Sequence, residues 1–190
     1  MKKNLMTAVL MTIATTILLG VIYPLAVTGV AQVLFPGQAN GEAIRRNGTM
    51  IGSKLIGQEF SGAGYFHSRP SAAGDGYDAA NSNGTQLGPT NRKLIAEVGA
   101  RTAAAHKEDS AGPVPIDLVT ASASGLDPDI TPAAAQFQVS RVARERGITE
   151  MAVRALVEKY TEGRQFGFLG EPHVNVLELN LALDRVQPMR

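Results

Sequence analysis

The segment from Leu5 to Pro24 reads Leu-Met-Thr-Ala-Val-Leu-Met-Thr-Ile-Ala-Thr-Thr-Ile-Leu-Leu-Gly-Val-Ile-Tyr-Pro, and the apolar run continues to Phe35. No charged side chain falls between Lys3 and Glu42. About 20 apolar residues, each rising about 1.5 Å along a helix, span the hydrocarbon core of a bilayer. The sequence therefore predicts one N-terminal transmembrane α-helix within residues 1–35, lying in the lipid bilayer.

A cleaved signal peptide is the alternative interpretation of this segment. Gly29-Val30-Ala31 matches the small-x-small pattern that precedes a cleavage site. The apolar core of a signal peptide usually holds about 7–15 residues, and this run is much longer. We therefore favour an uncleaved anchor.

The charges that flank the helix predict its orientation. Lys2 and Lys3 precede the apolar run and should stay in the cytoplasm, because positive charges are retained on that side. Arg45 and Arg46 follow the run, but they belong to a long segment, where charge has less effect on translocation. We expect residues 36–190 to form an extracytoplasmic soluble domain.

Small residues recur along the predicted helix at Ala8, Thr12, Thr16 and Gly20. Small side chains at four-residue spacing form a face that lets another helix approach closely. Threonine and alanine are also ordinary components of membrane helices, so the spacing has a plain structural interpretation too. Taken as a packing face, it predicts a protein partner inside the bilayer. Pro24 lacks a backbone donor and is expected to perturb the helix near Gly20.

The first half of residues 36–190 predicts few regular elements. Residues 49–60 alternate loosely and should contain a short strand. Residues 61–89 are rich in Gly, Ser, Asn and Pro but also hold aromatic side chains, which indicates an ordered loop rather than a disordered linker. A helix should follow a cap at Thr90 or Asn91, and residues 116–120 could form another short strand.

The second half predicts three helices. Thr131-Pro132 opens one that ends near Arg146 at Gly147, and Thr149 opens another that ends at Gly163. Residues 174–184 alternate as a strand would, but Asn175 and Glu178 could be a helix cap and its partner, which favours a helix. The predicted fold class is a single N-terminal transmembrane α-helix followed by one α+β soluble domain.

Composition excludes several kinds of site. The 190 residues carry a net charge of +1, which gives no argument for a nucleic-acid partner. The absence of cysteine removes disulfides, thiolate metal sites and cysteine nucleophiles. The histidines, His67, His106 and His173, have no metal-ligand spacing. No phosphate-binding loop or nucleophile elbow is present, so we predict neither a catalytic residue nor a metal site.

Two other classes of function remain open from the residues alone. A membrane-tethered hydrolase could use Ser68 or Ser124, provided that a general base lies within about 2.6–3.2 Å of the hydroxyl. A stand-alone tethered binding module would purify without larger membrane subunits.

Several longer motifs resemble one known family, the C subunits (KdpC) of the bacterial Kdp potassium-transporting P-type ATPase. The matching stretches are Gly57-Gln58 with Phe60, Gly64-Tyr65-Phe66 with Arg69-Pro70-Ser71-Ala72, Leu87-Gly88-Pro89-Thr90-Asn91, Leu118-Val119-Thr120-Ala121-Ser122-Ala123-Ser124-Gly125-Leu126-Asp127-Pro128, Arg141-Val142-Ala143, and Val174-Asn175-Val176 with Leu179-Asn180-Leu183-Asp184. The resemblance covers nearly the whole chain.

The resemblance implies an accessory subunit of an ATP-driven potassium importer in the bacterial inner membrane. Its implied partners are a channel-like potassium-binding subunit, a P-type ATP-hydrolysing subunit and a small membrane peptide. The chain lacks the Asp-Lys-Thr-Gly-Thr phosphorylation motif and a Thr-Val-Gly-Tyr-Gly filter, so it is neither motor nor pore.

The resemblance also implies a catalytic chaperone that raises the pump's affinity for ATP. The nucleotide contact proposed for the family corresponds here to Ser82, Asn83, Gly84, Thr85 and Gln86. Thr85 and Gln86 stand where Ser and Asn are common in the family. The predicted topology places this turn outside the cell and ATP inside, so either the nucleotide effect is indirect or the orientation is reversed. The topology rests on the simpler argument, and we favour it.

Overall fold

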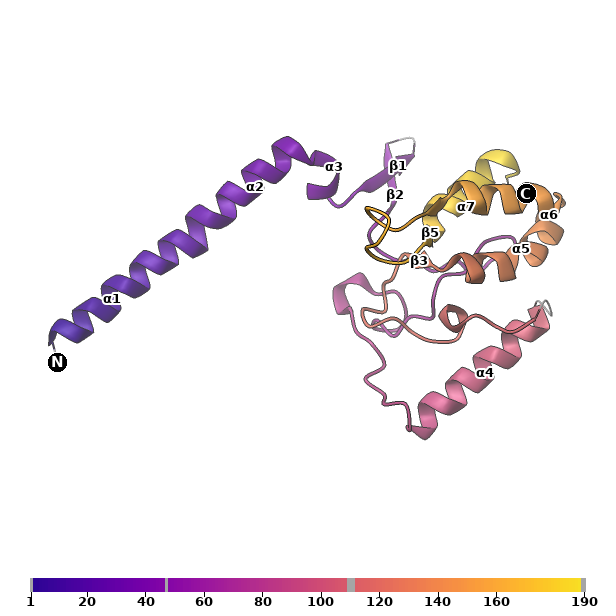
Figure 1. Cartoon of the computed structure of the whole chain (residues 1–190), viewed down its shortest axis with the longest axis horizontal. Helices are drawn as coiled ribbons and strands as arrows, with labels where there is room; N and C mark the ends of the chain where they lie inside the picture. The colour runs from indigo at the N-terminus through magenta and orange to yellow at the C-terminus, as the bar shows by residue number, and fades with distance from the viewer. Residues whose placement is uncertain (1, 47, 109–111, 189–190) are drawn as a thin grey trace. The chain divides into compact units, whose positions relative to one another are not determined.

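The computed structural model describes residues 2–46, 48–108 and 112–188 (Figure 1). The chain divides into two compact units, one ending at Ile44 and the other beginning at Arg45. Within the described ranges, one helix is long and apolar enough to cross a membrane, and it spans Lys2–Leu34. A domain of helices and two small sheets follows. The predicted fold class is therefore confirmed.

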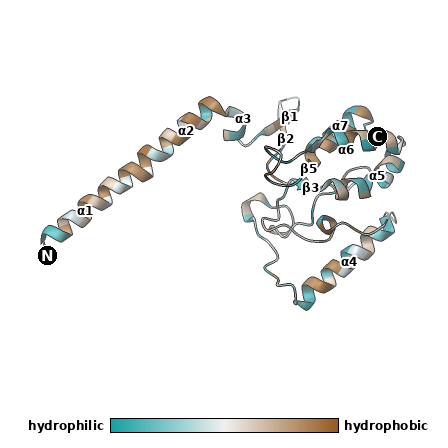
Figure 2. Cartoon of the chain, in the orientation of Figure 1, coloured by the Kyte–Doolittle hydropathy of each residue, from teal (hydrophilic) through white to brown (hydrophobic). Residues whose placement is uncertain are grey.

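The N-terminal helix consists of α1 (Lys2–Ile17), the π-helical turn η1 (Leu18–Ile22) and α2 (Tyr23–Leu34). Large apolar side chains are exposed along its whole length, and its ribbon in Figure 2 is largely brown, with paler stretches and a teal N-terminal end. None of its side chains is buried. A helix that is apolar all round needs lipid or protein around it, which agrees with a membrane segment.

Pro24 explains why the helix contains a π turn. Proline has no N–H to donate to the carbonyl four residues earlier, at Gly20. The helical turn before Pro24 holds one extra residue. As a result, the Tyr23 N–H donates to the Leu18 carbonyl, five residues back. The helix continues through the turn as one ribbon, so the proline perturbs the helix without ending it (Figure 1).

The chain after the helix is only partly regular. The short helix α3 (Pro36–Ala39) precedes a two-stranded sheet of β1 (Ala43–Arg46) and β2 (Thr49–Ser53). The strand expected within residues 49–60 thus ends at Ser53. The Ser53 hydroxyl accepts from the Leu55 N–H at 3.1 Å and turns the chain there.

Residues 61–89 form an ordered loop, as predicted, with only the 3-10 turn η2 (Ala79–Asn81) in it. The Ser71 hydroxyl accepts from the Ala73 N–H at 3.1 Å and from the Tyr77 N–H at 2.7 Å. The Tyr77 hydroxyl donates to the Arg69 carbonyl at 2.5 Å. Serine and tyrosine side chains thus replace the backbone ladders that the loop lacks.

The helix α4 (Arg92–Glu108) begins where the sequence predicts, because the Asn91 side chain accepts from the Lys93 N–H at 2.8 Å. The strand expected at residues 116–120 is wrong. Ile116–Leu118 forms the 3-10 turn η3, and the Thr120 hydroxyl, two residues after the turn, donates to the Ile116 carbonyl at 2.8 Å. The Asp117 carboxylate accepts from the Thr131 N–H, also at 2.8 Å. The first of these bonds is local and the second reaches a later segment of the chain, and together they stabilise a turn over a strand.

The core of the second unit lies among three helices and a three-stranded sheet. The helices are α5 (Pro132–Arg146), α6 (Glu150–Lys159) and α7 (Val176–Val186). The sheet is antiparallel in the order β3 (Asp129–Ile130), β5 (His173–Asn175), β4 (Thr161–Glu162). The core side chains are Phe66, Ile130, Ala134, Ala135, Val139, Val142, Ala143, Val153, Val157, Val174, Val176, Leu179 and Leu183.

Caps place these helices, mostly as the sequence predicts. Thr131 and Thr149 accept from the N–H groups of Ala134 and Ala152, and Gly147 ends α5 with a left-handed φ of 66°. Asn175 caps α7, which confirms the helical interpretation of residues 174–184 from Val176 onwards. The end of α6 differs: the helix stops at Lys159, because Thr161 and Glu162 pair with β5 instead.

Candidate functional site

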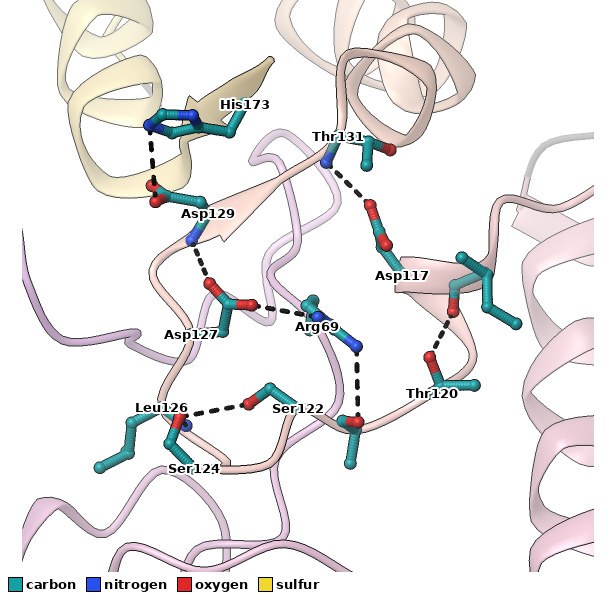
Figure 3. Close-up of polar contacts among 12 residues, drawn as sticks. Arg69, Asp117, Thr120, Ser122, Ser124, Leu126, Asp127, Asp129, Thr131 and His173 are labelled. Carbon is teal, nitrogen blue, oxygen red and sulfur yellow. Dashed lines mark hydrogen bonds and ion pairs between the residues drawn. The ribbon is translucent and has the colours of Figure 1, made fainter. Parts of the chain in front are cut away.

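Two of the segments that carry family motifs, residues 69–72 and 118–128, meet in a cluster of loops around Arg69 (Figure 3). The Arg69 guanidinium donates to the Asp127 carboxylate at 3.1 Å and to the Ala121 carbonyl at 3.5 Å. Asp127 also accepts from the Asp129 N–H at 3.1 Å. His173 lies 3.8 Å from the Asp129 carboxylate. A chain of polar contacts thus links the loop at residue 69 to β5.

Two glycines allow these loops to approach closely. A Cβ at Gly57 would lie 2.5 Å from the Asp127 carbonyl oxygen, and the Gly57 N–H donates to the Leu126 carbonyl at 2.7 Å. A Cβ at Gly125 would lie 2.5 Å from the Asn83 carbonyl oxygen, and Gly125 has a left-handed φ of 68°. Any larger residue would separate the loops.

The turn predicted to contact nucleotide packs against this cluster. The Ser82 hydroxyl and the Asn83 N–H both donate to the Ser124 carbonyl, at 3.0 and 2.9 Å. Gly84 lies against the Ala123 carbonyl, which a Cβ would approach to 2.8 Å. The Gln86 amide donates to the Asn83 side chain at 2.9 Å, and Thr85 accepts from the Leu87 N–H at 3.4 Å. The turn is therefore built by bonds to its own backbone and to residues 122–125.

Two buried amide side chains hold the backbone next to the core. Asn180, on α7, accepts from the Phe66 N–H at 2.8 Å and donates to the Phe66 carbonyl at 2.9 Å. Gln138, on α5, does the same for His67, at 2.8 and 3.2 Å. Each amide thus satisfies both backbone groups of one residue, as a neighbouring strand would.

Two buried arginines extend this support. Arg141 donates to the carbonyls of Ala63 and Tyr65 at 2.5 and 3.0 Å. Arg146 donates to the Gly64 carbonyl at 2.5 Å and to the Asp184 carboxylate at 3.0 Å, and its guanidinium lies 4.6 Å from the centre of the Tyr65 ring. Planar guanidinium groups suit such multiple contacts better than a lysine would.

A pocket of about 180 Å³ lies where α4 faces α5, and it is lined by His67, Ser68, Arg101, Ala104, Ala105, Glu108, Leu118, Phe137, Gln138 and Arg141. Burial, and then the positive charge of Arg141, lower the pKa of His67 below its usual value of 6.5. The lowered pKa favours the neutral imidazole. Its Nε2 lies 3.2 Å from the Gly62 carbonyl, where a ring N–H can donate.

The geometry gives no support to a serine hydrolase. The buried Ser68 hydroxyl donates to the Gln58 carbonyl at 3.3 Å, and the Ser124 hydroxyl accepts from the Leu126 N–H at 3.1 Å. Among the described residues, neither hydroxyl has a histidine as hydrogen-bond partner. Within the same ranges, no three His, Asp or Glu side chains are grouped to hold a metal ion.

The four residues of the predicted membrane packing face lie on α1 and η1. The Thr12 hydroxyl donates to the Ala8 carbonyl at 2.9 Å, so its polar group is satisfied within the helix. The Thr16 methyl would lie 3.9 Å from a Cβ at Gly20. A second helix could therefore meet methyl groups and bare backbone along this face.

The sequence did not predict the supporting role of Gln138, Arg141, Arg146 and Asn180, although Arg141 and Asn180 lie within the family motifs. All four are buried, although polar and charged residues are usually exposed. Asn180 interrupts the apolar pattern of α7, and a polar residue on an apolar helix face is the signal that could have identified it. Its partner, 114 residues earlier, could not be read from that pattern.

The comparisons with known proteins all point to one family, and they cover nearly the whole chain. Residues 5–185 match the family model for KdpC, described as the c chain of the K+-transporting ATPase. The chain is 63% identical over 189 residues to the potassium-transporting ATPase KdpC subunit of Koribacter versatilis, covering 100% of this chain and 98% of the relative. The subunit of the same name from Rhodospirillum rubrum is 56% identical over 191 residues, covering 100% and 99%. The one from Mycobacterium tuberculosis is 52% identical over 189 residues, covering 98% and 100%. The chain therefore belongs to the KdpC family of K+-transporting ATPase subunits.

Proposed function

We propose that this chain is the membrane-anchored accessory subunit of an ATP-driven potassium importer. Its partners are a channel-like potassium-binding subunit, a P-type ATP-hydrolysing subunit and a small membrane peptide. The chain assembles or stabilises this complex, and it raises the affinity of the ATP-hydrolysing subunit for ATP. It performs no chemistry itself.

The observation that carries the proposal is the family match over residues 5–185, which includes both the apolar helix and the loop cluster. The loop cluster supports a role in assembly rather than in catalysis. Its polar groups mostly bond one another or the backbone. Among the residues that the structure describes, neither Ser68 nor Ser124 is hydrogen-bonded to a histidine. Loops joined by hydrogen bonds, in a chain that also has a membrane anchor, suit binding to larger subunits.

The proposed location is the bacterial cytoplasmic membrane, with Lys2 and Lys3 in the cytoplasm and the second unit outside. Protease added to right-side-out vesicles should then cleave the second unit, and inverted vesicles should protect it. Cleavage only in inverted vesicles would reverse the proposed orientation and restore direct contact with cytoplasmic ATP.

With this orientation, the effect on ATP is indirect and passes through the partner subunits. Residues 82–86 then act by fixing the loop cluster rather than by binding nucleotide. The complex purified without this chain should show a higher KM for ATP than the full complex. A photoreactive ATP analogue should label the ATP-hydrolysing subunit and leave residues 82–86 unlabelled. Labelling of this turn, competed by ATP, would establish direct binding instead.

A further inference from the structure

The connection between β4 and β5 presents apolar side chains to solvent at its tip. Phe166 is 87% exposed and Phe168 is 71% exposed, while Leu169 is half exposed. Large aromatic residues of a folded domain are usually buried, and a cluster of exposed ones marks an interaction site. We call residues 165–169 the aromatic loop; in Figure 1 it belongs to the orange-yellow segment that leads into β5.

Hydrogen bonds hold the aromatic loop in a defined shape. The Gln165 N–H donates to the Leu169 carbonyl and the Leu169 N–H returns to the Gln165 carbonyl, both at 2.9 Å. At the base of the loop, the Arg164 guanidinium contacts both carboxylate oxygens of Glu171, at 2.8 and 2.7 Å. The exposed rings are thus carried by a closed turn rather than by a free strand end. Such preorganisation lowers the entropy lost on binding.

The backbone at the tip of the aromatic loop is strained at Phe166, one of the two exposed phenylalanines. Phe166 has a left-handed φ of 52°, which a bulky residue rarely adopts. Glycine would fit this position at lower cost, as Gly167 does next to it, with a φ of 83°. A phenylalanine here is unfavourable for the fold and adds exposed apolar surface. Strain of this kind is concentrated at binding sites.

Charge around the aromatic loop identifies the kind of partner. A hollow of about 260 Å³ adjoins the base of the loop, and it is lined by Arg69, Asp117, Asp127, Asp129, Ile130, Thr131, Glu171, Pro172 and His173. Four carboxylates thus line the hollow, against the guanidinium of Arg69 inside it and that of Arg164, which pairs with Glu171. Glu162, on β4, adds an exposed carboxylate near His173. Segments that bind anionic membranes are typically rich in Lys and Arg instead, so this charge favours a protein partner.

We infer that the aromatic loop docks into an apolar socket with a basic rim on another protein subunit of the transport complex. This inference rests on the proposed function, because it places the partner within that complex. Two phenylalanine side chains cover roughly 150–250 Å² each when buried. Together with the acidic surroundings they form a central anchor with a charged rim, the usual anatomy of a protein interface.

Site-specific photo-crosslinking tests the inference in the whole complex. Phe168 is replaced by the photoreactive residue p-benzoylphenylalanine in membranes that hold all the subunits. Irradiation should produce an adduct with another subunit of the copurified complex. Met151 on α6 is 78% exposed, and the same probe placed there is the control and should give no such adduct. Adducts with lipid alone, or none while the chain still copurifies, would overturn the inference.

Two substitutions separate docking from folding. Phe166→Gly relieves the left-handed φ, so the second unit should unfold at the same temperature or higher, while the chain leaves the solubilised complex about tenfold faster. Phe168→Ser should act similarly on the complex, and Met151→Ser should act on neither. If Phe166→Gly lowers the unfolding temperature and leaves the complex intact, the loop serves the fold instead. If even the unmodified chain fails to copurify with large subunits, the proposed function itself is wrong.

Discussion

Asn180 satisfies both backbone groups of Phe66, accepting from its N–H at 2.8 Å and donating to its carbonyl at 2.9 Å. Phe66 and Asn180 are both fully buried. Phe66 leads into the loop that ends at Arg69, so this contact sets where the loop cluster sits on the core. One side chain on the last helix thus fixes a segment 114 residues away.

Asn180→Ala should destabilise the second unit by about 2–4 kcal/mol, because it leaves a buried donor and a buried acceptor without partners. Thermal unfolding of the full chain in detergent, read by tyrosine fluorescence, measures the change. Asn81→Ala is the matched control: Asn81 is exposed and its amide donates to the Asp78 carboxylate at the surface, so its effect should stay within about 1 kcal/mol. Equal losses of stability in the two variants would show that the bonds between Asn180 and Phe66 do not stabilise the fold.

Arg146→Lys should cost about 2–3 kcal/mol although the charge is kept. Arg146 spreads its donors over Gly64, Gln187 and Asp184, and one ammonium cannot reach all three from the same position. The exposed Arg144 on the same helix gives the control substitution, Arg144→Lys, which should be nearly neutral. Urea unfolding in detergent would compare the two, and a neutral Arg146→Lys would contradict this account.

Gly125→Ala should separate the turn at residues 82–86 from the loop at residues 122–125. The new methyl group would meet the Asn83 carbonyl at 2.5 Å and the Ala73 nitrogen at 2.7 Å, at a left-handed φ. Faster proteolysis within residues 82–91 is the expected result. Gly163→Ala, with open space around the new methyl, should leave the cleavage rate unchanged. Unchanged cleavage in both variants would mean that the loops tolerate separation.

Stability should fall as the pH drops below about 6.5, partly because of His67. Burial lowers the pKa of His67, so the folded chain binds fewer protons than the unfolded chain in this range. The stability contribution is present above pH 6.5 and is lost as the pH falls towards the lowered folded pKa. His67→Gln should flatten the dependence of unfolding temperature on pH between 7 and 5. The exposed His106 provides the control, His106→Gln, which should behave as the unmodified chain does.

Burial raises the pKa of Asp129, which acts with the opposite sign over the acid range. The difference between His67→Gln and the unmodified chain isolates the histidine from this effect. A difference that does not vary with pH would refute the assignment.

Thr16→Leu combined with Gly20→Leu should release the chain from the complex, since each leucine would fill the small-residue face of the membrane helix. Ala14→Leu is the matched control, because at about 100° per residue position 14 lies nearly opposite Thr16. Stoichiometry of the purified complex, measured by quantitative mass spectrometry, gives the answer. Full retention of the double variant would show that the partner lies on another face.

The sequence by itself determined the elements that depend on local physics. An uncharged apolar run predicts the membrane helix, because no other backbone form suits lipid. Thr131, Thr149 and Asn175 predict helix starts, since each cap bonds an N–H three residues ahead. Gly147 predicts the end of α5, because glycine readily adopts the left-handed φ at which helices end. The longer motifs predicted the family, which the matches over residues 5–185 confirm.

Only the tertiary structure decided how the loops are used. Residues 116–120 look like a strand but form a turn, because the Asp117 carboxylate bonds Thr131 from another segment. The sequence does not show whether the Asn180 side chain faces water or the core. The fold places the Phe66 backbone next to it, and the amide is buried there. Phe166 is aromatic in the sequence, yet its exposure and its left-handed φ arise from the closed turn around it. Contacts between residues far apart in the chain have no periodicity, so only the folded arrangement reveals them.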